Sequence, residues 1–400
     1  MPRVNPSILS WARETAGFRL EEAAAKLGIR EARGVDPAER LTLLERGEAE
    51  PSRPLLLRMA KQYRRPLLTF YLSEPPRTGD RGRDFRTLGH GQADDDEAIL
   101  DALIRDVRSR QSLVRAALEE DEAVAPRPFV GAMRIQDGRV AVMDSIRASV
   151  GFSLSEFRSR ANATIAFEYL RERAQDAGVF VLLQGNLGTH HTALSLVTFR
   201  GLALADPYAP FVVINDQDSR AAWSFTLVHE LAHLWLGATG VSGGLPSKGI
   251  EQFCNDVASE FLLPSTELDI LGTGLPSDVE ALDRSVGEFA ESRNVSRTLV
   301  AYKLFRSSRL TEDAWQALSA RFREQWHELR GRRRLEAREE DGGPSYYVVR
   351  RHRLGQALID VAARSLHSGS LPTSKVAQVL GVKPKQVGVL LQDERSRRAS

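Results

Sequence analysis

Two histidines and a glutamate stand together in the middle of the chain, in the order His229-Glu230-Leu231-Ala232-His233. If this segment is helical, the two imidazoles lie one turn apart on one face, at a separation that suits a shared tetrahedral zinc ion. Glu230 lies one step round the helix, so its carboxylate can reach a zinc-bound water without binding the metal. Zinc lowers the pKa of such a water to about 7, and a carboxylate can then take its proton as the hydroxide attacks a peptide carbonyl. The pattern therefore predicts a hydrolytic zinc site with Glu230 as the general base.

The same ion needs a third protein ligand, and the next expected helix, over residues 251–263, supplies the candidates. Four of its side chains carry ligand atoms: Glu251, Cys254, Asp256 and Glu260. At about 100° per residue, Glu251 and Glu260 point in opposite directions, and of these two only Glu251 borders the apolar arc of the helix. We therefore predict Glu251 as the third ligand, with Asn255 one turn later as its hydrogen-bonding partner. Cys254 is predicted to be a small core residue.

A helix and a small sheet are expected to position these residues. The segment RAAWSFTLVHELAHLWLG, residues 220–237, reads as a helix that starts at Asp218 or Ser219 and ends at Gly237. Short apolar runs before it predict strands over 179–184, 193–199, 202–206 and 211–215. The last run, FVVIN, is expected either at an edge of the sheet, where an extended substrate would pair with it, or inside the core.

The chain of 400 residues is too long for one hydrophobic core, and its patterns predict a multidomain, mainly helical protein. Four parts follow one another: a helical domain over 1–75, a linker and helix over 76–125, the small α/β core over 126–330, and a basic helical region over 331–400. The helix of the second part is expected over 98–120. The last part is expected to open with a polar linker over 331–345.

Composition limits the compartment and the metal chemistry. The sequence lacks the basic and then apolar order of a signal peptide, and it has no apolar run long enough to cross a membrane. This predicts a cytoplasmic protein without a membrane partner. Cys254 is the only cysteine, so an internal disulfide is excluded and the metal ligands are expected to be His and carboxylate groups. Such ligands favour one zinc ion per chain, with manganese as the alternative.

The net charge is close to zero, with 55 basic and 53 acidic side chains, but its distribution is uneven. Basic residues gather in the C-terminal part, where they either meet an acidic partner or form a solvated surface.

With HELAH preceded by FVVINDQDSRAAWSFTLV and followed by EQFCNDVASEFLLP, the chain resembles the ImmA/IrrE family of zinc metallopeptidases over roughly residues 160–310. The resemblance implies a compact gluzincin-like α/β fold in which His229, His233 and Glu251 bind zinc and Glu230 is catalytic. It also implies a protein substrate, since members of this family typically cleave a specific repressor or regulator, often one that holds down phage, mobile-element or stress-response genes.

The segments LEEAAAKLGI and LERGEAEPS resemble the Cro/repressor-type (XRE) helix-turn-helix domain that is often fused to such peptidases. Its candidate base-reading side chains are Glu39, Arg40 and Thr42, but the connector REARGVDPAER is longer than usual. Residues 1–75 are also only faintly positive, with thirteen basic against ten acidic side chains. The tail TSKVAQVLGVKPKQVGVLL has a second helix-turn-helix pattern and is more basic. DNA binding by the N-terminal or the C-terminal helices, docking onto a repressor, self-association and simple packing remain alternatives, and the oligomeric state stays open.

The sequence as a whole predicts a zinc-dependent endopeptidase that cleaves a transcriptional repressor. The alternative is a DNA-binding regulator or an antitoxin whose metal site is not catalytic. The intact Glu230 argues against this alternative, because a purely structural zinc site has no use for it. His190 or His191 is a weaker candidate for an oxyanion donor, because exposed loop histidines are usually inert, and Tyr346 and Tyr347 rank equally low.

Overall fold

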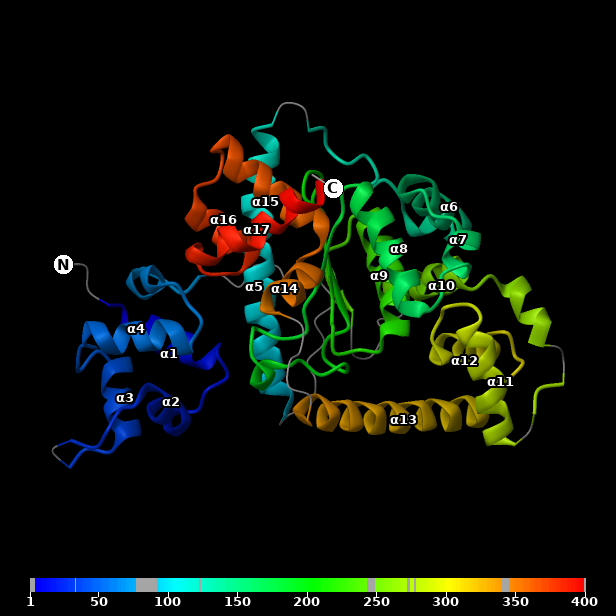
Figure 1. Ribbon diagram of the computed structural model, residues 1–400. Helices are drawn as coiled ribbons and strands as arrows, with labels where there is room; N and C mark the ends of the chain where they lie inside the picture. Colours follow the sequence, from blue (N-terminus) through cyan, green and yellow to red (C-terminus); the bar gives the residue numbers. More distant parts are fainter. Residues whose placement is uncertain are drawn as a thin grey trace. The chain divides into compact units, whose positions relative to one another are not determined.

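The computed structural model of the protein describes residues 4–32, 34–76, 92–121, 124–242, 249–271, 274–276, 278–339 and 345–398. Helices dominate these residues, and one small sheet lies among them (Figure 1). This confirms the predicted fold class, a mainly α protein with a small α/β core. None of the described helices is both long enough and apolar enough to span a bilayer.

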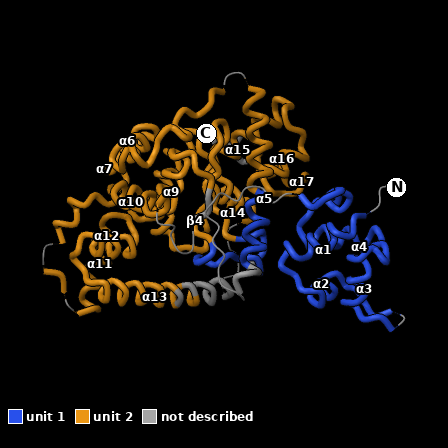
Figure 2. The backbone as a smooth tube through the Cα atoms, turned by 180° about the vertical axis from the view of Figure 1, so that it is seen from behind, with its two compact units in different colours: residues 1–81, 87–106, 186–198 blue, residues 82–86, 107–185, 199–400 orange. Residues whose placement is uncertain are grey.

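The backbone divides into two compact units (Figure 2). Unit 1 consists of residues 1–81, 87–106 and 186–198, and unit 2 of residues 82–86, 107–185 and 199–400. The C-terminal helices therefore belong to the same unit as the sheet.

The N-terminal part of unit 1 is a group of short helices with a core of its own. These helices are α1 Pro6–Glu14, α2 Leu20–Leu27, α3 Pro37–Glu45, α4 Arg53–Gln62 and the 3-10 helix η1 Leu67–Tyr71. The side chains of Asn5, Asp36 and Ser52 accept hydrogen bonds from amides in the first turns of α1, α3 and α4. These amides have no partner within a helix, so the caps fix where each helix begins. The Arg13 guanidinium joins α1 to α3 through a two-point ion pair with Glu45, at 2.7 and 2.9 Å.

Unit 2 is built around a four-stranded sheet in the order β1-β3-β2-β4. Its strands are β1 Phe180–Leu183, β2 Gly201–Leu204, β3 Phe211–Ile214 and β4 Gly240–Ser242. β1 is parallel to β3, whereas β2 is antiparallel to both β3 and β4. Every residue of β1, β2 and β3 is buried, so both faces of these strands are covered.

Helices lie on both sides of the sheet (Figure 1). On one side, α8 Ala163–Asp176 and α9 Arg220–Trp235 contact the strands, and α6 Arg139–Val150 and α10 Ile250–Leu262 pack onto α9. Alternate strand residues point into this main core: Val181, Leu183, Ala203, Val212 and Ile214. The second half of α5 Gln92–Glu119 lies on the other side, where Gln111 donates hydrogen bonds to two carbonyls at the end of β2 and beyond it, at 3.0 and 2.8 Å.

The remaining elements either follow α10 in the chain or connect elements that are already named. They are η2 Ile135–Asp137, α7 Leu154–Arg158, η3 His190–Thr192, η4 Ser265–Leu271, α11 Val279–Glu291, α12 Arg297–Arg306, α13 Glu312–Glu339, α14 Tyr346–Leu354, α15 Gln356–Ser368, α16 Thr373–Leu380 and α17 Pro384–Arg398. The buried Arg171 of α8 fastens α14 to the sheet, because its guanidinium donates to the carbonyls of Val181 and His352 at 2.8 and 2.7 Å. Arg353 adds an ion pair with Asp216, at 2.6 Å, in the loop before α9.

One expectation about strands is wrong. Residues 193–199 form a turn, in which the Ser195 and Thr198 hydroxyls are 2.8 Å apart and the Thr198 amide donates to Ser195 Oγ. Such local bonds compete with a sheet ladder. Of the two positions expected for FVVIN, the structure shows the internal one, because β3 pairs on both sides and no extended substrate can add to it. The sequence pattern also missed β4, whose three residues are too few to show a period of two.

Two helices extend further than the sequence indicated. α5 starts at Gln92 instead of 98, and α13 continues to Glu339, well into the predicted linker 331–345. Residues 332–339 consist of Arg, Leu, Glu and Ala, which all favour helix, so nothing in them stops α13. Residues 77–91 of the other predicted linker lie outside the described part of the chain.

Candidate metal centre

The two motif histidines lie on α9, as predicted. The helix begins after Ser219 and ends before Gly237, whose φ of 66° turns the chain so that the Ala238 amide reaches the His233 carbonyl at 2.9 Å. Nearly every residue of α9 from 223 onward is buried, because the helix lies between the sheet, α8 and α10. This packing fixes the position of the histidine backbone in the core.

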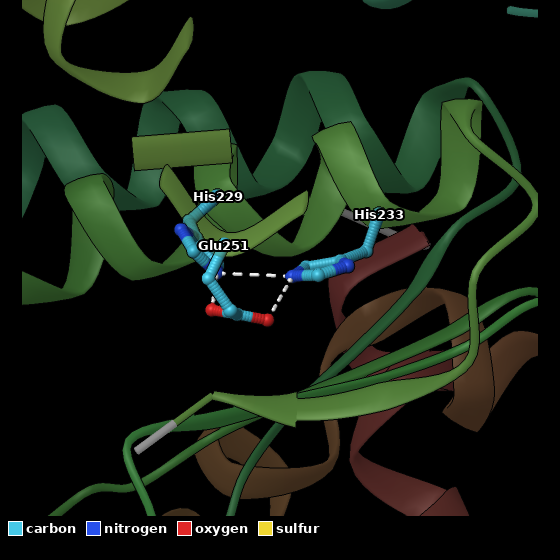
Figure 3. Close-up of side chains that lie close together, drawn as sticks. All are labelled: His229, His233 and Glu251. Carbon is cyan, nitrogen blue, oxygen red and sulfur yellow. Dashed lines mark hydrogen bonds and ion pairs between the residues drawn. The ribbon is translucent and has the colours of Figure 1, made fainter. Parts of the chain in front are cut away.

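His229 and His233 project from one face of α9 towards the Glu251 carboxylate on α10 (Figure 3). The two Nε2 atoms are 3.1 Å apart. One carboxylate oxygen of Glu251 lies 3.1 Å from Nε2 of His229, and the other lies 3.0 Å from Nε2 of His233. The histidines are each 3% exposed and Glu251 is 9% exposed. The structure therefore brings together, in a buried place, the three residues that the sequence analysis selected.

The three ligand atoms fit a small divalent cation. Atoms that share a tetrahedral ion at about 2.0–2.2 Å lie about 3.3–3.6 Å apart, so the cluster needs to widen by only a few tenths of an ångström. The Nδ1 atoms of both histidines are buried and have no hydrogen-bond partner among the described residues. With hydrogen on Nδ1, both Nε2 atoms and the carboxylate are acceptors that face one another, and such a group is stable only around a cation or shared protons.

Glu251 and Glu260 lie on opposite sides of α10, as helix geometry predicts. The Glu260 carboxylate is 2.5 Å from the Lys303 ammonium, and its other oxygen accepts a hydrogen bond from the Ser265 amide at 3.0 Å. Both carboxylates are therefore partnered, but only Glu251 faces the histidines. Asn255 is half-buried one turn after Glu251 and has no hydrogen-bond partner among the described residues, so its supporting role stays a prediction.

The electrostatics of the cluster favour a positive charge. Burial alone raises the pKa of Glu251, but the hydrogen bonds with His229 and His233 outweigh it and hold this pKa well below its usual range. For His233, burial lowers the pKa, yet contacts with Cys254, Glu251 and Glu230 raise it well above the ordinary value. Cys254 is a buried core residue, as expected; burial raises the pKa of its thiol, and the nearby His233 offsets part of this rise.

Glu230, the predicted general base, is fully buried against the sheet. Its carboxylate lies over Gly201, the first residue of β2, so closely that a β-carbon on Gly201 would be 2.3 Å from Glu230 Oε1 and 2.7 Å from Thr226 Cγ2. The absence of a side chain at 201 therefore creates the space that Glu230 occupies. The sequence analysis did not select Gly201. The signal that could have pointed to it is a glycine at the start of an otherwise apolar strand, where a neighbouring side chain needs space.

The other candidate residues are not brought to this cluster by any contact between described residues. His191 is exposed in η3, and the side chain of His190 lies outside the described part of the structure. Tyr346 is 53% exposed on α14, where its ring stacks edge-on against Tyr347. On α3, Glu39 is exposed, the Arg40 guanidinium donates to the Arg30 carbonyl, and Thr42 Oγ1 donates to the Ala38 carbonyl at 3.0 Å.

Two histidines one helical turn apart, a buried glutamate beside the first and a carboxylate from the next helix define the site of a metallopeptidase. Residues 181–305 match the model of a peptidase family described as the IrrE N-terminal-like domain, over a stretch that runs from β1 to α12 and contains all four side chains. The match spans less than a third of the 400 residues. No curated protein and no solved structure matches the chain. The family match and the cluster together support a metallopeptidase of the IrrE type with a metal cofactor.

Proposed function

We propose that the protein is a cytoplasmic zinc-dependent endopeptidase that cleaves one specific protein, a transcriptional repressor. The observation that carries the peptidase assignment is the combination of a buried ligand triad, His229, His233 and Glu251, with the buried carboxylate of Glu230 on the same helix. A site that only stabilised the fold would need the three ligands but not Glu230. The repressor as substrate rests on the resemblance to the IrrE type and on the helical N-terminal unit, which is a candidate for docking such a partner.

The chain's own residues divide the catalytic work. His229, His233 and Glu251 hold the metal, and the packing of α9 against α10 keeps their side chains together. When bound, a zinc ion supplies a Lewis acid for the scissile carbonyl and acidifies water at the site. Glu230 takes a proton from the attacking water at its carboxylate and then delivers it to the leaving amine. Because Glu230 is fully buried, its charge acts in a medium of low dielectric constant, where its effect on neighbouring groups is strong.

Glu230→Gln tests this division of roles. The amide has nearly the same shape but cannot accept the proton, so the variant should keep about one zinc per chain by mass spectrometry and lose cleavage by about 10²- to 10⁴-fold. Because the substrate is unidentified, the probe is a library of peptides made from a cell lysate, with new termini read by mass spectrometry. Glu260→Gln is the matched control, since it makes the same change on the far side of α10.

Each result of this comparison decides the proposal. Cleavage by the wild type and by Glu260→Gln, but not by Glu230→Gln, supports the peptidase. Equal cleavage by all three would show that Glu230 is not the base. A zinc-loaded wild type that cuts neither the library nor intact lysate proteins would overturn the peptidase assignment in favour of a binding protein.

A further inference from the structure

The last three helices of the chain pack as a helix-turn-helix unit. α15, α16 and α17 contact one another in sequence order, and they lie together in both views (Figures 1 and 2). α16 ends at Gly381, whose φ of 59° turns the chain, and α17 begins at Pro384, so the connector has the length and the glycine of a helix-turn-helix. Val376 and Leu380 of α16 and Val387 and Leu390 of α17 are buried. The geometry makes α17 the second, recognition helix of the motif.

This unit is basic, with seven Lys or Arg against three Asp or Glu over residues 356–398, although the chain as a whole is nearly neutral. Residues 361–392 contain four basic side chains, Arg364, Lys375, Lys383 and Lys385, and no Asp or Glu. All four are exposed. None of the three lysines has a side-chain hydrogen bond or an ion pair with a described residue, so their charge is available to a partner. A surface of this kind is complementary to a polyanion.

The solvent face of α17 has the residue types that read base edges. At about 100° per residue, Lys385, Val389 and Gln392 lie opposite the buried Val387 and Leu390. Lysine can contact guanine or a phosphate, valine the methyl group of thymine, and glutamine the edge of adenine. Val389 is an apolar side chain that is 47% exposed, so packing against the described residues does not account for it. Gly388 lies beside this row, and a β-carbon there would meet nothing within 4 Å. Another molecule therefore has room to approach the backbone of α17 at this point.

The N-terminal helices are less suited to this role. Two of the three candidate base-reading side chains on α3 are already used inside the domain, since Arg40 donates to the Arg30 carbonyl and Thr42 to the Ala38 carbonyl. The charge of residues 1–75 is also nearly balanced, unlike that of residues 361–392. Between the two helical regions, the observations favour the C-terminal one as the nucleic-acid surface.

We propose that α15–α17 bind double-stranded DNA, with the exposed row of α17 in the major groove and Lys375, Lys383 and Lys385 on the phosphates. This role is additional to the proposed peptidase activity and does not depend on the metal, because no metal ligand lies in these helices. It would give the enzyme a position on DNA, where a DNA-bound repressor is also found.

The test uses the full-length protein and a fluorescein-labelled 30-base-pair duplex of random sequence, with binding followed by anisotropy at several salt concentrations. Lys383→Glu/Lys385→Glu should weaken binding at least tenfold and reduce the slope of log affinity against log salt by about 2. The matched control is the same charge reversal on α3 and at its end, Arg40→Glu/Arg46→Glu, which should change affinity less than threefold. His229→Ala should bind as the wild type does, which separates this proposal from the peptidase.

Two further measurements complete the test. Because the substituted lysines are exposed, thermal unfolding should be unchanged, and a misfolded variant would be recognised there. Polyglutamate of the same total charge serves as the competitor that represents an acidic protein. The proposal is overturned if the wild type does not bind the duplex at 50 mM salt, if the α3 variant loses binding while the α17 variant keeps it, or if polyglutamate competes as well as unlabelled duplex.

Discussion

Gly201→Ala is the substitution for which the structure gives the most specific prediction. The added methyl group would lie 2.3 Å from Glu230 Oε1, about 1.1 Å closer than the 3.4 Å at which ordinary contact begins. It cannot escape sideways, because Thr226 Cγ2 would be 2.7 Å away. The carboxylate of Glu230 therefore has to move by about an ångström, while the three metal ligands, on other residues, stay in place.

The size of the effect follows from that displacement. A catalytic group misplaced by about 1 Å costs on the order of 10²-fold in rate, or about 2.7 kcal/mol of transition-state stabilisation. Extra volume in a packed core also costs about 1–3 kcal/mol of unfolding free energy. We expect kcat to fall about 10²-fold, KM to change little, and the zinc content to remain that of the wild type.

The assay compares Gly201→Ala with Gly388→Ala, because the same methyl group on α17 would meet nothing within 4 Å. kcat and KM are measured on a peptide identified from the library, with metal content and thermal unfolding recorded for each variant. Glu230→Asp provides a second comparison: its carboxylate is one methylene shorter and lies further from position 201. The stability cost of Gly201→Ala should therefore be smaller in the Glu230→Asp background.

Two results would refute this reasoning. One is an unchanged kcat in Gly201→Ala, which would mean that the carboxylate has room that the structure does not show. The other is a loss of activity that parallels a loss of zinc, which would mean that the substitution disturbs the fold of the metal site and not the position of Glu230.

Three further predictions concern the metal and the surrounding fold. Glu251→Ala should lower zinc content sharply while Glu260→Ala leaves it unchanged, since only Glu251 faces the histidines; the reverse result in mass spectrometry would refute the choice of ligand. Free zinc at about 100 times its Kd should stabilise the wild type by about 2.7 kcal/mol, seen as a rise in Tm that His229→Ala lacks; equal rises would place the ion elsewhere. Asp283→Asn should destabilise the protein by about 1–3 kcal/mol at pH 7, because burial raises the pKa of Asp283 but its bonds to Arg321, Gln325 and Arg297 lower it overall. A group with a lowered folded pKa stabilises above its unfolded pKa of about 3.9, and this contribution disappears as pH falls through the folded pKa. The difference between wild type and variant in urea unfolding should therefore vanish at low pH, and a constant difference would contradict this origin.

The sequence alone was sufficient for the residues whose relation is set by one helix. The spacing of His229 and His233 places both rings on one face of α9, wherever that helix lies in the fold. Glu251 and Glu260 point to opposite sides of α10, so only one of them can be a ligand. Helical periodicity located α9 and α10 closely, because this signal is local. The sequence does not determine whether Glu251 meets the histidines, because that contact depends on the packing of α10 on α9.

Relations between distant segments were decided by the tertiary structure. β3 has the same apolar sequence whether it lies at an edge or inside a sheet, and only the pairing with β1 and β2 made it internal. Residues 193–199 have a strand-like composition but become a turn, because hydroxyl bonds within the segment replace a partner strand. Gly201 lies 29 positions before Glu230, and no periodicity links them. The sequence thus determined the chemistry that α9 and α10 can carry, whereas the space that Glu230 occupies exists only because the sheet folds against α9.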